Sequence, residues 1–460
     1  MKKIDSCKWI LAPTERNKIP ITFFINDKLM NEMEPDVIRQ AQNATTIKGT
    51  TDVILTADCH VGAGVPIGSI VVTDPYEGAI SIGAVGADIA CGMRVLLTDY
   101  EAKTFYDKSK LRKLMDRIEE KIPTGLGKAQ EKAFPVPVKE ILKKGAEVLI
   151  DNNFGLPEDL EVMETYFKGE PDISYISETA RQKGTYQVGT LGSGNHFIEI
   201  QEVKAIPHPL AEKWGLHKGQ LVIQIHSGSR RLGFQVNEEL SKRFLKNFEK
   251  DELIDKNLVW VPWGTDEAEK AYQATIGASN YAMANRQAMT YYIRQIVPSA
   301  KVLYDLCHNT GRFEYMDDKK IFIHRKGATR ALPAGHPDNV PKYKATGHPV
   351  LIPGSMGTNS YVLVAGKNAK ESFYTVNHGS GRTMSRHAAK KRITNEDFIK
   401  AMGNILFNGR NPQDVIDEAP QAYKNIEDVI DSVVQAGLAE IVAVLKPMAG
   451  IKGKDARRRR

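Results

Sequence analysis

Short glycine turns that carry metal-binding or nucleophilic side chains recur between residues 58 and 386, and they constrain the fold most strongly. The turn at Gly86–Arg94, GADIACGMR, places Asp88 and Cys91 three residues apart between the apolar runs AISIGAV and VLLT. Because a carboxylate and a thiolate can both lose a proton and bind a cation, this turn supplies half of a metal site. No repeat or low-complexity linker divides the turns, so we expect one interwoven domain.

Three further turns carry imidazoles. His196 follows a glycine loop in TLGSGNHFIEI, His226 ends the apolar run of LVIQIHSGSRRLG, and His308 lies in LCHNTGRFE. A single histidine of this kind is more often a hydrogen-bonded structural residue, and a lone cysteine is more often a small buried hydrophobe. Several together favour a metal site, since imidazole is the commonest protein ligand. The donor types indicate zinc or another borderline metal, and five donors can hold two ions with Cys91 as a bridge.

The segment NHGSGRTMSR surrounds His378 with glycines, which allow a large ligand to approach the ring. Arg382 and Arg386 follow at i+4 and i+8, where the start of a helix would align both guanidinium groups as a phosphate clamp. A histidine in this setting acts as a general base or as a nucleophile that forms a phosphoramidate. The alternative is a helix-capping loop with solvent-exposed arginines.

The totals describe an ordinary globular protein of 460 residues, with 42% hydrophobic and 26% charged residues. The net charge of +7 permits a polyanionic partner such as nucleic acid without requiring one. Four cysteines without C-x-x-C spacing favour a reducing compartment. The sequence contains no signal peptide and no membrane-spanning run, so we expect a soluble cytoplasmic protein.

Helical periodicity and short apolar runs alternate along the chain, which indicates an α+β fold. Helices are predicted from residue 109 to Pro123, over 265–296 with Thr265 or Asp266 as the N-cap, and over 426–445 with Pro447 as the stop. Residues 124–190 contribute no predicted catalytic residue. The last residues, KDARRRR, form a basic tail at 454–460 that we expect to be solvated and dispensable for chemistry.

Ten motifs, in sequence order, resemble those of the RtcB family of RNA-splicing ligases, and they extend from about residue 50 to residue 453. They are ADCHVGAGVPIGS, GADIACGM, LGSGNHFIEI, IHSGSR, HN at 308–309, RKGA, IPGSMGT, NHGSGRTMSR, AYK at 422–424 and KG at 452–453.

This resemblance implies a single interwoven α+β domain over residues 1–453, with mixed β-sheets flanked by helices and an active site in a central cleft. It also implies a ligase that depends on GTP and on two manganese ions. A histidine takes GMP from GTP and passes it to an RNA 3′-phosphate, which can first be formed by opening a 2′,3′-cyclic phosphate. A 5′-hydroxyl RNA end then expels GMP. The implied role is tRNA splicing or RNA repair by a cytoplasmic monomer, with an activating protein as a further possible partner and no membrane.

The resemblance also assigns residues. His378 matches the guanylylated histidine, and Cys91 matches the bridge between two manganese ions. The other matching metal ligands are Asp88, His196, His226 and His308. Positions that match guanylate contacts are Asn195, Phe197, Glu199, Ser355, Tyr423 and Lys452. Positions placed near phosphate or RNA are Arg230, Arg382, Arg386 and Asp58, the last as an acid held beside the metal site.

Three positions depart from the family's usual P-D-V-H-x-G-K-G loop. Ala57 replaces proline, Cys59 replaces valine and Ala63 replaces lysine, which removes one positive charge beside the predicted site. Two alternatives therefore stay open: a metal-dependent phosphoesterase that acts on RNA ends without joining them, and a non-catalytic paralogue that binds RNA ends. On the metal, the family's manganese takes precedence over the zinc that the donor types alone indicate.

Overall fold

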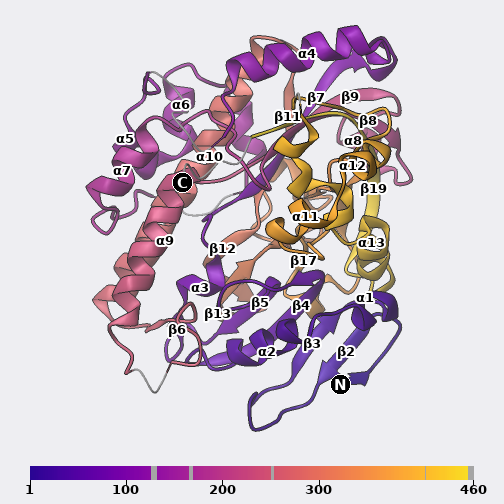
Figure 1. Cartoon of the computed structure of the whole chain (residues 1–460). Coiled ribbons are helices and arrows are strands. Elements are labelled where there is room, and N and C mark those ends of the chain that lie inside the picture. Colours follow the sequence, from indigo (N-terminus) through magenta and orange to yellow (C-terminus); the bar gives the residue numbers. More distant parts are fainter. Residues whose placement is uncertain (126–131, 165–168, 250–252, 410, 454–460) are drawn as a thin grey trace.

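The computed structural model describes residues 1–125, 132–164, 169–249, 253–409 and 411–453, so the basic tail at 454–460 lies outside the described residues. Two large sheets are combined with helices of very different lengths (Figure 1), which confirms the predicted α+β class. Among the described helices, none combines the length and the apolar character needed to cross a membrane.

The first sheet has seven strands, mostly antiparallel, and contains the N-terminal strands at the bottom of Figure 1. Its one parallel pair joins β3 and β4, so the prediction of mixed sheets is confirmed. In spatial order the strands are β1 (Lys2–Lys3), β2 (Lys8–Leu11), β3 (Ile21–Phe24), β4 (Thr50–His60), β5 (Ile67–Thr73), β13 (Lys319–Lys326) and β12 (Asn309–Met316).

The second sheet has eight strands and holds most of the predicted metal ligands at one edge. In spatial order they are β11 (Lys301–Cys307), β7 (Gly92–Glu101), β9 (Gln220–Ser227), β8 (Phe197–Ala205), β19 (Ala439–Lys452), β16 (Ser360–Ala365) and β15 (Val350–Ile352), with β18 (Leu406–Phe407) beside β19. Two small sheets pair β6 (Ala79–Ile80) with β10 (Val261–Pro262), and β14 (Ala328–Arg330) with β17 (Thr375–Asn377).

The helices flank these sheets, and the longest of them, α10, runs beside α9 at the left of Figure 1. Their bounds are α1 (Asp27–Asn31), α2 (Pro35–Ala44), α3 (Ile82–Val85), α4 (Lys108–Lys121), α5 (Val138–Lys144), α6 (Ala146–Asp151), α7 (Glu178–Thr185), α8 (Leu210–Lys213), α9 (Arg230–Leu245), α10 (Asp266–Arg294), α11 (Arg386–Arg392), α12 (Asn395–Met402) and α13 (Ile426–Gln435).

Helix α10 confirms the helix predicted over 265–296. The Thr265 side chain accepts a hydrogen bond from the backbone N–H of Ala268, as expected of an N-cap. Ala271, Ala274 and Ala278 are fully buried, so the helix packs closely against its neighbours. This packing places the middle of α10 against the second sheet, where Arg286 becomes important for the site.

The predicted helix over 426–445 is wrong in its second half. Helix α13 ends at Gln435, and Gly437 turns the chain with φ of +68°, a conformation that favours glycine. Strand β19 then occupies residues 439–452, and Pro447 lies at a register irregularity within it. Most of the apolar residues beyond Gly437 are buried on strand β19. Because the run is short, the spacing of these residues also fitted the helical repeat, which caused the wrong prediction.

Candidate active site

Four neighbouring strands bring the predicted metal ligands to one edge of the second sheet. The register pairs His226 on β9 with Met93 on β7 and with Phe197 on β8, so Cys91 and His196 lie just beyond these partners. On the other side, the β7–β11 register pairs Gly92 with Cys307, the residue before His308. Antiparallel pairing therefore converts distant glycine turns into a single cluster.

The ligand atoms of this cluster lie close together. The Cys91 sulfur is 3.2 Å from Nε2 of His226 and 3.4 Å from Nε2 of His196. The Nε2 atoms of His226 and His308 are 3.3 Å apart, and Oδ2 of Asp88 is 2.8 Å from Nε2 of His196. All five side chains predicted as ligands are thus brought together.

Burial keeps the imidazoles of His226 and His308 neutral, which is the form that binds metals. Loss of solvation, with the other histidines nearby, holds the pKa of His226 and of His308 well below the ordinary value. Burial and the neighbouring Asp88 raise the pKa of Cys91 well above its usual range. A buried thiol of this kind ionises when a cation binds it, since a coordinating thiol is deprotonated outright.

The donors form two groups that share Cys91. Within Cys91, His226 and His308, and within Asp88, Cys91 and His196, the ligand atoms lie within 4.8 Å of one another. The Nδ1 atoms of His226 and His308 are buried without a hydrogen-bond partner among the described residues. The donor types and the shared sulfur fit two divalent ions bridged by a thiolate.

His378 lies directly beside this cluster, with its ring centroid 5.0 Å from that of His308. Its Nδ1 is 2.7 Å from Oδ2 of Asp58, a fully buried carboxylate at the far end of β4 in the first sheet. Burial alone would raise the pKa of Asp58, but His378 outweighs it and holds that pKa below the usual value. A proton on Nδ1 leaves Nε2 of His378 with its lone pair available.

Two glycines make this arrangement possible. A Cβ at Gly381, which has φ of +74°, would lie 2.2 Å from the carbonyl oxygen of Asp58. A Cβ at Gly192, with φ of +101°, would lie 1.8 Å from Nη1 of Arg230. The two loops predicted from their glycines therefore approach their partners more closely than any other residue would allow.

A cleft has His378 in its lining. Its lining includes five of the predicted guanylate positions, namely Asn195, Phe197, Ser355, Tyr423 and Lys452. Glu199 is not part of this lining. It lies two residues after Phe197 on β8, is buried, and accepts a hydrogen bond from Gln201. Burial, partly offset by Lys452, raises the pKa of Glu199 to about 8.

Glu418 organises this cleft, although no feature of the sequence pointed to it. Its carboxylate accepts from Tyr423 Oη at 2.6 Å and from Lys452 Nζ at 2.8 Å, and it pairs with Arg386 at 2.5 Å and Arg382 at 3.2 Å. Burial favours the neutral acid, but the three cations outweigh it and lower the pKa of Glu418 to about 2. Glu418 therefore holds Arg382, Arg386 and Lys452, three of the four cations predicted to lie near the nucleotide or its phosphates. The fourth, Arg230, is not paired with it.

The two arginines after His378 are brought together by Glu418 rather than by a shared helix, so that part of the sequence prediction is wrong. Helix α11 begins only at Arg386, and Ser385 caps it. Arg382 precedes it and lies with its guanidinium 4.8 Å from the Tyr423 ring centroid. Both side chains are tied to acids, so the alternative of freely solvated arginines does not describe them either.

Comparisons with known proteins agree with this geometry. The family model described as tRNA-splicing ligase RtcB matches residues 40–453. The chain belongs to the RtcB family. Proteins named tRNA-splicing ligase RtcB from Thermococcus kodakarensis and Aeropyrum pernix are each 36% identical to it, over 98% of this chain and 99% of theirs. A protein from Entamoeba dispar named RNA-splicing ligase RtcB homolog 1 is 38% identical, over 94% of this chain and 86% of its own length.

In this RtcB-family chain the metal-binding segments are tied together by Arg286 of α10, which sequence reasoning missed. The fully buried guanidinium binds Asp305 at 2.9 and 2.7 Å. It also donates to the carbonyl oxygens of Ala90 and Ser227, each at 3.0 Å, and to the sulfur of Cys307 at 3.3 Å. Each of these three acceptors is adjacent in sequence to a ligand, so one side chain spans three ligand segments.

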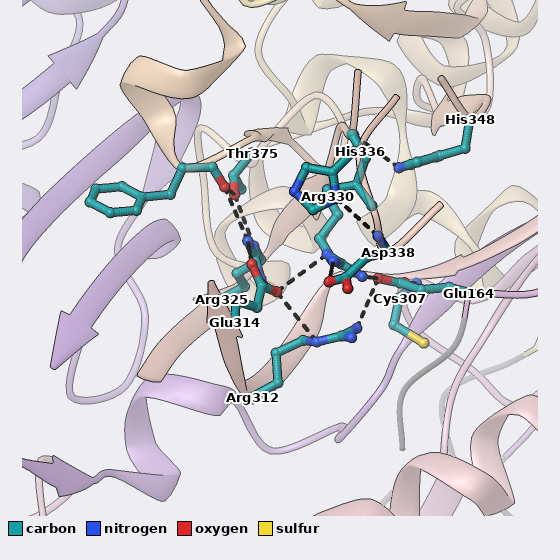
Figure 2. Close-up of polar contacts among 12 residues, drawn as sticks. Glu164, Cys307, Arg312, Glu314, Arg325, Arg330, His336, Asp338, His348 and Thr375 are labelled. Atoms are coloured by element: carbon teal, nitrogen blue, oxygen red, sulfur yellow. Dashed lines mark hydrogen bonds and ion pairs between the residues drawn. The ribbon is translucent and has the colours of Figure 1, made fainter. Parts of the chain in front are cut away.

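A second buried network holds the strand that precedes His378 (Figure 2). Arg325 donates to both carboxylate oxygens of Glu314, at 2.6 and 2.9 Å. The same guanidinium donates to Oγ1 of Thr375 at 2.8 Å and to the carbonyl of Phe373 at 3.1 Å. Because β17 ends one residue before His378, this network fixes where that histidine stands.

The other end of the same network reaches the metal ligands. Glu164 accepts from the backbone N–H of Cys307 at 2.9 Å and pairs with Arg330 at 3.2 Å and Arg312 at 3.4 Å (Figure 2). Glu164, which lies within residues 124–190, therefore helps to support the site, a role that the sequence did not reveal.

Ala57, Cys59 and Ala63 differ from the usual RtcB loop in their side chains. Their backbone carbonyls each accept a hydrogen bond from a lysine. Lys424 donates to the carbonyls of Ala57 and Cys59, and Lys326 donates to that of Ala63 at 2.5 Å. Ala57 and Cys59 are buried, and Ala63 is exposed on a cavity beside the metal cluster.

Proposed function

We propose that this RtcB-family RNA ligase joins an RNA 3′-phosphate or 2′,3′-cyclic phosphate to a 5′-hydroxyl RNA end through a covalent guanylate on His378. The observation that carries this proposal is that His378 belongs to both parts of the candidate site. Its ring lies beside the five predicted metal ligands, and it also lines the cleft that contains five predicted guanylate contacts.

Asp58 prepares His378 for nucleophilic attack. Its carboxylate lies 2.7 Å from Nδ1 and favours a proton on that nitrogen, so the Nε2 lone pair attacks the α-phosphorus of GTP and the bond to the β-phosphate oxygen breaks as pyrophosphate leaves. The positive charge that develops on the ring is stabilised by the same carboxylate. The backbone N–H groups of His378 and Gly379 hold Asp58 in place at 3.1 and 3.2 Å.

The later steps use the same phosphoramidate. An oxygen of the RNA 3′-phosphate attacks the guanylate phosphorus, the bond to Nε2 breaks, and the RNA end becomes activated with GMP. The 5′-hydroxyl of the second RNA end then attacks the activated RNA phosphorus and GMP leaves. Divalent ions held by the two donor groups, which we take to be manganese, would neutralise the charge on these phosphates.

The cleft supplies the groups that nucleotide recognition needs. Tyr423 offers an aromatic face for a base, while Lys452 and Arg382 offer positive charge that Glu418 holds in position. Glu199, when ionised, accepts hydrogen bonds from the N1–H and N2–H₂ edge of guanine, which favours GTP over ATP. Since Glu199 lies behind the cleft lining, this contact requires the side chain to turn towards the base.

Labelling with α-³²P GTP and Mn²⁺ tests the proposal. We expect an acid-labile, base-stable GMP adduct in the wild type and in His387→Ala, an exposed histidine of α11, and no adduct in His378→Ala. An adduct that forms equally in His378→Ala, or none in the wild type, would contradict the ligase mechanism. RNA ends trimmed of phosphate without joining would point instead to a metal-dependent phosphoesterase. Normal guanylylation without joining of 3′-phosphate to 5′-hydroxyl RNA would point to an RNA-end-binding paralogue.

A further inference from the structure

A second cavity, beside the metal cluster, shares His378 with the guanylate cleft. It has a volume of 450 Å³, and its lining includes Asp88, Cys91, His196 and His308 of the metal cluster. Among the described residues, Ile67, Asn195 and His378 line both spaces. The two cavities therefore border the same imidazole.

The second cavity is suited to a phosphate group. Arg230, Lys326 and Arg386 contribute three cations to its lining, against the single carboxylate of Asp88. Arg230 is buried and held by Thr190 at 3.3 Å, so its guanidinium is fixed before a ligand arrives. Fixed cations beside a metal cluster are the usual surroundings of a bound phosphate.

Phe234 lines this cavity beside the metal cluster. Its surface is 49% exposed, so a ligand in the cavity can reach the ring. Within the described part of the chain, no aromatic ring or cation is recorded against its ring. Phe234 follows Arg230 by four residues at the start of α9, and both side chains line the same cavity.

We propose that Phe234 stacks on the base of the terminal nucleotide of the phosphate-bearing RNA end, whose phosphate lies deeper in the cavity near Arg230. This inference rests on the proposed function, because it takes RNA as the substrate. Arg230 and Phe234 line one cavity, so a single terminal nucleotide can present its phosphate to the guanidinium and its base to the ring. Stacking on an aromatic face is tolerant of sequence, since every base has one.

The proposal predicts a base-dependent loss of RNA affinity. Affinity is measured by fluorescence anisotropy with Mn²⁺ and a labelled single-stranded RNA that carries a 3′-phosphate. The RNA is prepared in two forms, with an ordinary or an abasic 3′-terminal nucleotide. We expect Phe234→Ala to weaken binding of the ordinary RNA by about 5- to 150-fold, the equivalent of about 1–3 kcal/mol per stacked base. The same substitution leaves binding of the abasic RNA unchanged, and Phe234→Tyr restores the wild-type affinity.

A matched control comes from the same helix. Leu245→Ala removes another exposed apolar side chain at the far end of α9, and we expect it to bind both RNAs as the wild type does. Wild-type affinity of Phe234→Ala for the ordinary RNA would overturn the proposal. An equal loss on both RNAs would also overturn it, because the effect would then not involve the base.

Failure of the proposed function is recognised separately. Phe234→Ala should still form the GMP adduct, because the guanylate cleft does not include Phe234. If the wild type forms no adduct but the base-dependent loss of RNA affinity is observed, the stacking contact stands and the ligase mechanism falls. If the adduct forms and the base dependence is absent, the stacking contact alone is refuted.

Discussion

Replacement of Arg286 by lysine should weaken metal binding, although Arg286 contacts no metal ligand side chain. Lysine keeps the positive charge and can still pair with Asp305. It cannot reproduce the planar set of donors that also reaches the carbonyls of Ala90 and Ser227 and the sulfur of Cys307. The segments that carry Cys91, His226 and His308 would then lose their shared anchor.

The size of the effect follows from the contacts. Breaking a buried charged pair by removal of one partner costs about 3–5 kcal/mol, and the retained charge of lysine places the expected loss of unfolding free energy at the lower end of that range. Loss of a residue that orients metal ligands typically lowers metal affinity by about 10- to 100-fold. We therefore expect Arg286→Lys to lose both stability and Mn²⁺ affinity.

Urea unfolding and calorimetric titration with Mn²⁺ measure these two quantities separately. Arg94→Lys is the matched control, since Arg94 is equally buried and pairs with the same Asp305 at 2.6 Å. Its other contacts are to Gln287 and Thr290, away from the ligand segments. Arg94→Lys should lose stability and keep Mn²⁺ affinity. Equal Mn²⁺ affinities for the two variants would refute the role assigned to Arg286.

Three further predictions concern other parts of the chain. Cys91→Ala should lose both ions, because its sulfur belongs to both donor groups; elemental analysis that finds unchanged metal content would contradict this. For Glu418, whose pKa of about 2 lies below the usual 4.5, the stabilising contribution is present above about pH 4.5 and is lost as the pH falls towards 2. Glu418→Gln should therefore lower the unfolding free energy by about 3 kcal/mol at pH 7, and a gap to the wild type that stays constant down to pH 2 would refute this. Removal of residues 454–460 should leave formation of the GMP adduct intact, and its loss in the truncated chain would show that the tail takes part in the chemistry.

The sequence predicted the residues that the candidate site brings together, but it did not predict the contacts that support them. Asp88, Cys91 and the three histidines were recognisable because each lies in a glycine turn next to an apolar run, a local pattern. Their convergence depends on strand register, such as the pairing of His226 with Met93, which no local pattern specifies.

The supporting residues were hidden for a different reason. Arg286 lies in an alanine-rich helix, and its acceptors Ala90 and Ser227 are 196 and 59 residues away. Glu418 likewise gathers its partners from segments as distant as Arg382 and Lys452. Long-range polar contacts of this kind leave no periodicity in the sequence. The helix predicted over 426–445 failed beyond Gln435 for another reason. Its apolar pattern continued past Gly437, but that glycine turned the backbone and ended the helix.

Anomalous diffraction from a crystal grown with Mn²⁺ tests the central claim most directly, namely that distant glycine turns assemble a two-ion site around one thiolate beside His378. We predict two manganese peaks that share the Cys91 sulfur, one also bound by His226 and His308 and the other by Asp88 and His196. A single peak, or peaks that do not contact Cys91, would contradict the account.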